Sequence, residues 1–198
     1  MGITILAILA GLAVGAPLDS SSSSWDASTS QGYKHVCHDL LCEDPYLPVS
    51  TQPCYPWGNW SRPNIAKGGQ AALTVLELRD QGRPILKLVA KVIVGRVKAK
   101  QHVFVEQPAG SSWLEEEELV EVVKLIEEGL LITTGVDGCQ VGYCDRENGL
   151  PHHKPSTYLT TMLTAEALFS GMTCGRDHQH QYLEGNNCFG SRASQAFV

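Results

Sequence analysis

The stretch PYLPVSTQPCYPWGNWSRPN, from Pro45 to Asn64, decides how the rest of the chain is interpreted. A short apolar run, residues 46–49, leads through three polar residues to Pro53 and Cys54. Prolines fix φ and shape the turn, and residues at the carboxyl ends of strands in an open α/β sheet face the ligand crevice. We therefore expect a strand followed by a loop that carries Cys54. Taken alone, the stretch favours a cysteine that only packs, as most free cysteines do.

The composition is that of one globular domain. The chain has 198 residues, of which 43% are hydrophobic and 18% charged, which suits a single domain with a sizeable core. Its net charge is -6 and its basic residues are scattered, so tight electrostatic binding of nucleic acid by this chain alone is not predicted. Its seven cysteines are odd in number and irregular in spacing. They match a disulfide framework poorly, and reduced thiols with a bound metal are the better prediction.

The first sixteen residues allow two interpretations. Residues 3–16 are almost wholly apolar and end in small residues, with Ala13 and Gly15 placed as at a signal-peptidase site. Secretion would also make Asn59-Trp60-Ser61 a glycosylation sequon. Against secretion, no Lys or Arg precedes the apolar run. The alternative is a buried helix at 3–9 followed by a strand at 12–18. In either case the run is too short to span a bilayer.

Helices and strands alternate along the rest of the chain. Strands are expected at 46–49, 102–105, 130–134 and 156–161. Helices are expected at 31–42, 66–80, 83–100, 115–128 and 164–169, with a break at Gln81-Gly82. This order predicts an α/β, Rossmann-like and mostly parallel sheet, with helices on both faces. Residues 1–16 form an apolar segment, 17–172 the α/β domain and 173–198 an irregular Cys/His-containing tail.

An acidic residue directly follows the strand at 102–105. Glu106 is notable because an unpaired carboxylate beside a buried apolar strand is costly to desolvate. Most such residues cap a helix or accept hydrogen bonds from backbone amides, and fewer are catalytic. The sequence leaves both roles open.

The final third of the chain contains a candidate metal site. Cys174, His178 and His180 place one sulfur and two imidazoles within a few residues, and Cys139 can complete a tetrahedral Cys2His2 set. The spacing is not one of the common finger spacings. From the ligand types we nevertheless predict zinc at these four residues. The alternative is a polar loop that carries incidental histidines.

Three motifs occur in one order along the chain. Pro53-Cys54 follows the first strand, Glu106 follows the next, and GLPHHKP at 149–155 precedes a further strand. In this order they resemble the Pro-Cys nucleophile loop, the Glu-Asn-Val motif and the Gly-x-Pro-Gln-x-Arg-x-Arg motif of the cytosine-C5 DNA methyltransferases. Each motif is weak alone, and their order carries the resemblance.

The chain is more specifically similar to divergent methyltransferase-like segments in retroelement-type polyproteins of protists and algae. Those segments carry a Pro-Cys-x-x-Trp loop, a Phe-x-Glu-x-Pro-x-x-Ser-x-x-Trp block, a Lys-Pro-Thr strand and a Cys-x-x-x-His-x-His tail. The corresponding stretches here are PCYPW at 53–57, FVEQPAGSSW at 104–113, KPS at 154–156 and CGRDHQH at 174–180. The match spans roughly residue 17 to the C-terminus.

The resemblance implies a class I methyltransferase-like fold and a specific chemistry. Asp19 and Asp26 would contact the ribose and the adenine pocket of S-adenosylmethionine. Cys54 would attack C6 of a flipped cytosine in DNA while Glu106 hydrogen-bonds N3 and the exocyclic amine. The carboxylate is needed because negative charge entering the ring must be met by a proton at N3.

The chain also departs from the family pattern. It lacks the Gly-rich first loop that holds the methionine part of the cofactor, which predicts N-terminal truncation. Glu-Asn-Val is Glu106-Gln107-Pro108, and the arginines of the third motif are replaced by His153-Lys154 and Ser156. We therefore expect a domain that is catalytically silent alone, in the nucleus or cytoplasm, with DNA or the remainder of a polyprotein as partner. A zinc-stabilised module that binds nucleic acid or protein, and a secreted glycoprotein, are the alternatives.

Overall fold

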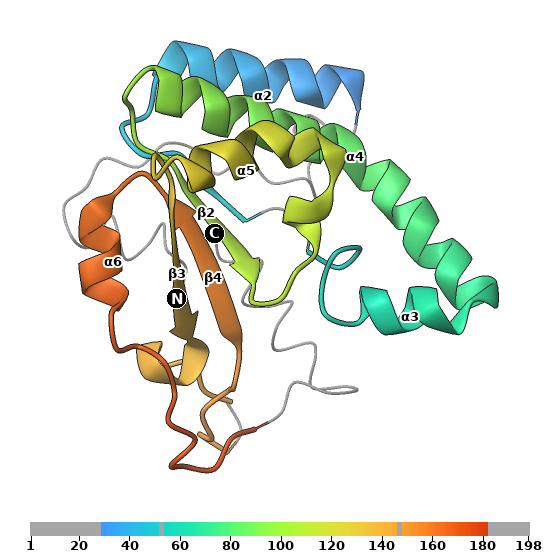
Figure 1. The fold of residues 1–198 in the computed structure, drawn as a ribbon, viewed down its shortest axis with the longest axis vertical. Coiled ribbons are helices and arrows are strands. Elements are labelled where there is room, and N and C mark those ends of the chain that lie inside the picture. The colour runs from blue at the N-terminus through green and yellow to red at the C-terminus, as the bar shows by residue number, and fades with distance from the viewer. Residues whose placement is uncertain (1–28, 52–53, 146–147, 182–198) are drawn as a thin grey trace.

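The computed structural model describes residues 29–51, 54–145 and 148–181. They form an α/β fold in which helices lie on both faces of one sheet (Figure 1). The expected apolar segment 1–16, the strand at 12–18 and the cofactor residues Asp19 and Asp26 lie outside the described residues. Among the helices described, none has both the length and the apolar character that crossing a bilayer requires.

The described sheet has four strands, β1 (Val49–Ser50), β2 (Phe104–Pro108), β3 (Ile132–Asp137) and β4 (Pro155–Thr160). Their order in space is β1-β2-β4-β3. β1 pairs with β2 in parallel, whereas β4 pairs antiparallel with both β2 and β3. The first three strands therefore run in one direction, as the sequence predicts, with β4 inserted in the opposite direction.

The prediction of a mostly parallel sheet is wrong for the described residues, because β4 contributes two antiparallel pairings. Helices lie between β1 and β2 and between β2 and β3, and they return the chain to the edge at which the previous strand began. Between β3 and β4 the described chain has only the short 3-10 helix η3 (Gly138–Val141). A parallel return needs a crossover connection, usually a helix, so β4 runs back along the sheet.

Two layers cover the sheet. The long helix α4 (Gly69–Lys98) and α5 (Val120–Glu127) bury their apolar sides against one face, where Leu86, Ile93 and Val105 are nearly inaccessible to solvent. α2 (Ser30–Glu43) lies alongside α4 (Figure 1). The other face carries α6 (Leu163–Phe169), whose Phe169 ring stacks on Tyr158 of β4 at 5.2 Å.

The expected break at Gln81-Gly82 does not occur, and α4 is one helix of 30 residues. A methyl group at Gly82 would lie 2.5 Å from Cη2 of the buried Trp57. The glycine is therefore explained by the close approach of an indole ring rather than by a turn. The short α3 (Ser61–Lys67) precedes α4, and α3 and the first part of α4 extend beyond the sheet to one side (Figure 1).

The acidic helix expected at 115–128 is shorter than predicted. Two 3-10 turns, η1 (Trp113–Glu115) and η2 (Glu117–Leu119), precede α5. Glu116 lies between the two turns with 8% of its side chain exposed, and Glu118 in η2 with 2%. Both carboxylates pair with arginines of α4. Burial of these charges against arginine accounts for the departure from a regular helix.

Candidate metal centre

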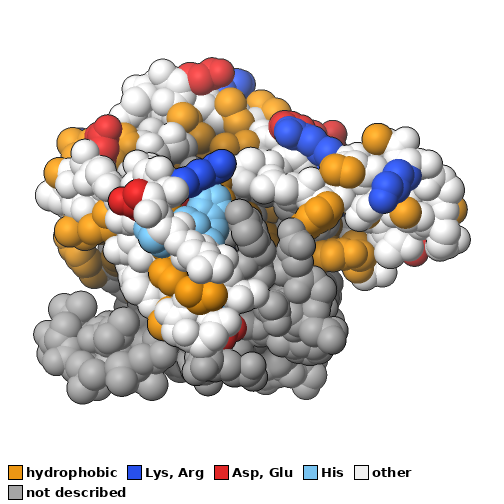
Figure 2. Space-filling model, turned by 90° about the horizontal axis from the view of Figure 1, so that it is seen from below, with side chains coloured by type: hydrophobic (Ala, Val, Ile, Leu, Met, Phe, Trp, Pro, Cys, Tyr) orange, Lys and Arg blue, Asp and Glu red, His pale blue; other side chains and the backbone are white. Residues whose placement is uncertain are grey.

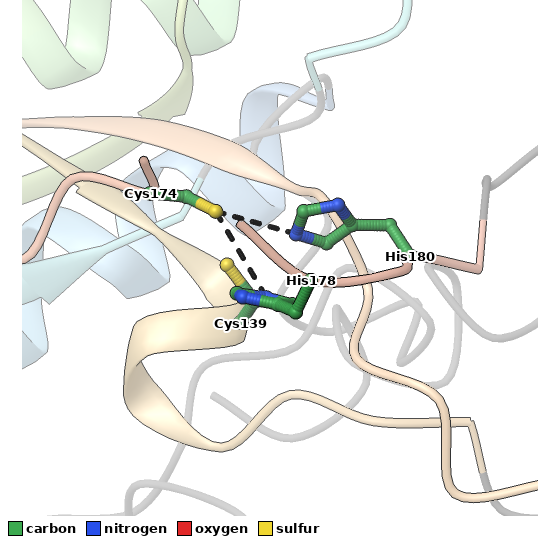
Figure 3. A group of neighbouring side chains, drawn as sticks. All are labelled: Cys139, Cys174, His178 and His180. Atoms are coloured by element: carbon green, nitrogen blue, oxygen red, sulfur yellow. Dashed lines mark hydrogen bonds between the residues drawn. The ribbon is translucent and has the colours of Figure 1, made fainter. Parts of the chain in front are cut away.

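The four residues predicted as zinc ligands come together at one end of the sheet. Cys139 belongs to η3, which directly follows β3, and Cys174, His178 and His180 lie on the segment after α6 (Figure 3). One potential ligand atom from each of them lies within 4.8 Å of all the others. Figure 2 looks at the molecule from below and shows histidine side chains gathered at the surface.

Two of the separations between these atoms are close to those expected around one tetrahedral ion, and all of them are within 4.8 Å. Sγ of Cys174 lies 3.4 Å from Nε2 of His180 and 3.9 Å from Nε2 of His178. Zinc–sulfur and zinc–nitrogen bonds imply ligand–ligand separations of about 3.3 to 3.8 Å in a tetrahedron. A small contraction of the cluster therefore accommodates zinc, and metal binding itself stays a prediction.

Backbone contacts anchor both ends of the segment that carries three of the ligands. Asp137 N donates to Met172 O at 2.9 Å, and Cys174 N donates to Oδ2 of Asp137 at 2.6 Å. At the other end, Gln181 N donates to Pro151 O at 2.9 Å. The ligand loop is therefore attached to the end of β3 and to the segment that leads into β4.

Asp177 contacts one candidate ligand and was not predicted from the sequence. Its Oδ1 lies 2.8 Å from Nδ1 of His178, and this hydrogen bond is the main reason that the pKa of Asp177 is lowered. With Nδ1 engaged, Nε2 of His178 is the nitrogen that faces Cys174. A carboxylate on the far nitrogen of a ligating histidine fixes its tautomer and orientation.

The pKa shifts at two of the candidate ligands have opposite consequences for metal binding. Burial, followed by the charges of His178 and His153, lowers the pKa of His180, so its imidazole is neutral at pH 7. Burial, followed by a hydrogen bond with Cys174, raises the pKa of the Cys139 thiol. Zinc must therefore displace a firmly held proton from Cys139, because it binds thiolate rather than thiol.

Cys54 lies in the loop that follows β1, and Glu106 lies in the neighbouring strand β2. Val49 and Ser50 of β1 pair with Phe104 and Val105 of β2, so the next position of β2 is Glu106. Cys54 follows β1 by a few residues and is half-buried. Neighbouring parallel strands thus lead to both residues, but Glu106 lies inside β2 rather than after the strand as predicted, and their joint role in catalysis stays a prediction.

The structure gives Glu106 partners that the sequence did not predict. Ser156 Oγ donates to Oε1 of Glu106 at 2.7 Å across the β2–β4 pair. Tyr158 of β4 is directly opposite Glu106. Burial, followed by the charge of Glu106, raises the pKa of Tyr158 to about 12. The same two causes raise the pKa of Tyr143. Glu106 therefore lies among neutral hydroxyl groups.

A buried polar network holds the loop that follows Cys54. Trp57 Nε1 donates to Oε1 of Glu116 at 3.0 Å, and the Arg79 guanidinium donates to the same oxygen at 3.0 Å. Arg79 Nε also donates to Pro56 O at 2.9 Å. The sequence shows this network only as an arginine on an amphipathic helix. Arginines are too common on such helices for that pattern to identify a buried network.

The fold and the cluster together define an α/β domain with a candidate four-ligand metal centre. No protein family model matches the sequence, and no curated protein matches it. A solved structure of the methyltransferase EhMeth from Entamoeba histolytica is a distant structural match, with a TM-score of 0.32 and 12% sequence identity. The match covers 75% of this chain and 38% of the EhMeth chain.

Proposed function

We propose that this chain is a zinc-binding α/β domain in which one metal ion fastens the segment after α6 to the end of the sheet. The observation that carries the proposal is the convergence of four ligand atoms within 4.8 Å. Two thiolates and two imidazoles fill all four positions of tetrahedral zinc, which is the composition of a structural site. The domain then acts as a binding module rather than as a metalloenzyme.

The role of the metal follows from where its ligands lie. Cys139 is part of η3, whereas Cys174, His178 and His180 belong to a segment without regular secondary structure. Zinc would therefore cross-link parts of the chain that lie 35 or more residues apart in sequence (139 to 174). Because such a site does not exist in the unfolded chain, the binding free energy of the metal stabilises the fold.

Metal analysis of the purified protein tests the proposal. We expect one zinc per chain, removal by a strong chelator, and a lower melting temperature for the metal-free protein. Cys174→Ser should reduce the zinc content to a trace. Cys144→Ser is the matched control, because Cys144 is an exposed cysteine outside the cluster. Purified protein without stoichiometric zinc, or zinc that persists in Cys174→Ser, contradicts the proposal.

We also propose that the domain is a degenerate relative of the S-adenosylmethionine-dependent cytosine-C5 DNA methyltransferases, silent on its own. Two observations favour this relationship. The motifs occur in the family's order along the chain, and β1, which precedes Cys54, pairs in parallel with β2, which contains Glu106. A fold and a motif order do not establish activity. Asp19 and Asp26 remain the proposed cofactor contacts.

Methyl transfer from labelled S-adenosylmethionine to cytosine-containing DNA tests this second proposal. We expect no incorporation of label. Incorporation that is lost in Cys54→Ser would show an active enzyme and overturn the silent state. Cys144→Ser again serves as the control for loss of an unrelated thiol.

The proposed partners and location follow from the same chemistry. DNA, or the remainder of a longer chain, is the proposed partner. Thiolate ligands persist where cysteines stay reduced, so we propose the nucleus or cytoplasm. N-terminal sequencing of the protein from its native cell tests the location. A terminus created by cleavage after the apolar residues 3–16 would support the secreted alternative instead.

A further inference from the structure

The two thiols of the cluster are held side by side by the backbone. Sγ of Cys139 and Sγ of Cys174 lie within 4.8 Å of each other. Cys139 is two residues beyond Asp137, whose backbone and side chain hydrogen-bond to Met172 and Cys174. Protein contacts therefore hold the two sulfurs close together.

One of the two sulfurs lies on an exposed loop. Cys174 is half-buried, and its neighbours Thr173, Gly175 and Arg176 are all exposed. Arg176 N donates a hydrogen bond to Sγ of Cys174 at 3.2 Å, so a backbone amide of the exposed loop contacts this sulfur. A small oxidant can therefore reach the Cys174 sulfur. The Cys139 thiol lies close enough to react with the oxidised product.

We propose that Cys139 and Cys174 form a redox-convertible pair, in which a hydroperoxide converts the two zinc-bound thiolates into a disulfide and releases the metal. This inference rests on the zinc site proposed above and adds a form of regulation to it. The two imidazoles that remain, His178 and His180, make half of a tetrahedral ligand set. Loss of both thiolates therefore abolishes high-affinity binding.

The reaction balances with hydrogen peroxide as the oxidant. The Cys174 thiolate attacks one peroxide oxygen, the O–O bond breaks, and a sulfenic acid and hydroxide form. The Cys139 thiolate then attacks the Cys174 sulfur, the S–S bond forms, and a second hydroxide leaves. Two electrons pass from the thiolate pair to the peroxide, and protons from water convert hydroxide to water. A dithiol reductant reverses the oxidation, and the metal then binds again.

Treatment of the zinc-loaded full chain with hydrogen peroxide tests the inference. Zinc release is followed with a chromogenic chelator, the disulfide by peptide mass spectrometry, and recovery by adding a dithiol and zinc. We expect one zinc released and two thiols lost per chain, with Cys139 joined to Cys174. Cys144→Ser, which keeps both sulfurs, should behave like the wild type.

The outcomes separate this inference from the proposal beneath it. A protein that binds no zinc before oxidation overturns the metal site and the redox conversion together. A protein that binds one zinc but keeps it under peroxide, or that releases it without a 139–174 disulfide, overturns the redox conversion alone. Cys139→Ser provides a second measurement, because without its partner Cys174 should accumulate a sulfenic acid that a dimedone-type probe labels. Failure to trap that product in a folded variant also contradicts the proposed order of attack.

Discussion

Ser156 donates a hydrogen bond of 2.7 Å to the carboxylate of Glu106, and the two residues lie on adjacent antiparallel strands. The register pairs Glu106 with Tyr158, so Ser156 is its diagonal neighbour on the same face of the sheet. The donor to the Glu106 carboxylate is therefore a neutral hydroxyl group.

Removing this donor should destabilise the domain. Ser156→Ala leaves a half-buried carboxylate without its charge-assisted hydrogen bond, and we expect the free energy of unfolding to fall by about 1 to 2 kcal/mol. Urea denaturation of the variant and the wild type measures this free energy of unfolding. In the Glu106→Gln background the acceptor is neutral, so Ser156→Ala should cost less. Equal costs in the two backgrounds would show that the charge of Glu106 contributes nothing to the bond.

Arg79 should be the costliest arginine of α4 to remove. Its side chain is 16% exposed and that of its partner Glu116 is 8% exposed, so Arg79→Met leaves a buried carboxylate with part of its positive charge missing. We expect a loss of about 3 kcal/mol. The control is Arg62→Met, because Arg62 and Glu115 form an exposed pair worth less than about 1 kcal/mol. Chemical denaturation of both variants decides the matter, and similar costs would contradict a buried network.

Two glycines of α4 should respond in opposite ways to alanine. In Gly82→Ala the new methyl group meets the buried ring of Trp57, and we expect a loss of about 1 to 3 kcal/mol. In Gly95→Ala it meets no atom within 4 Å, so the higher helix propensity of alanine should stabilise the protein by up to about 1 kcal/mol. Thermal unfolding compares them. If both substitutions stabilise the protein, the contact between Trp57 and Gly82 is not tight.

Asp177→Asn should weaken zinc binding without removing a ligand. The carboxylate orients His178 through Nδ1, and loss of such a partner lowers metal affinity by roughly 10-fold or more. Competition with a zinc-binding dye at pH 7 measures the affinity. Glu127→Gln, at an exposed acid in the last turn of α5, removes one negative charge far from the ligand loop in sequence and should leave the affinity unchanged. Equal affinities in the two variants would exclude a positioning role for Asp177.

The ionisation of Tyr158 should destabilise the protein at high pH. Its folded pKa is raised from 10 to about 12 by burial and by Glu106. The folded state therefore holds the phenolic proton more tightly, and the resulting stability is complete below pH 10 and lost as the pH rises through about 12. The contribution is about 2 kcal/mol. Urea denaturation at pH 9 to 11 should show a shallower decline in Tyr158→Phe than in Tyr55→Phe, a control at an exposed tyrosine. Identical declines in the stability of the two variants would contradict the raised pKa of Tyr158.

Local sequence patterns predict the helices and strands and most of the candidate metal site. Apolar periodicity predicted strands β2 to β4 and helices α2 and α6 close to their observed bounds, because each element must bury one face of its own. Cys174, His178 and His180 are identifiable because only three residues and one residue lie between them, so a single loop presents all three. Cys139 has no such local spacing, and the sequence indicates it only as a cysteine that can complete a set of four ligands.

The way these elements meet depends on contacts between residues that are distant in sequence. The insertion of β4 between β2 and β3 depends on pairings between distant strands, which local periodicity does not encode. The continuity of α4 through Gly82 depends on the ring of Trp57, and the interruption before α5 depends on arginines more than thirty residues away. The contacts of Glu106 with Ser156 and of His178 with Asp177 likewise require placed side chains. The physical reason is the same throughout: burial is signalled locally, whereas the partner that satisfies a buried charge or ring is selected by the folded chain.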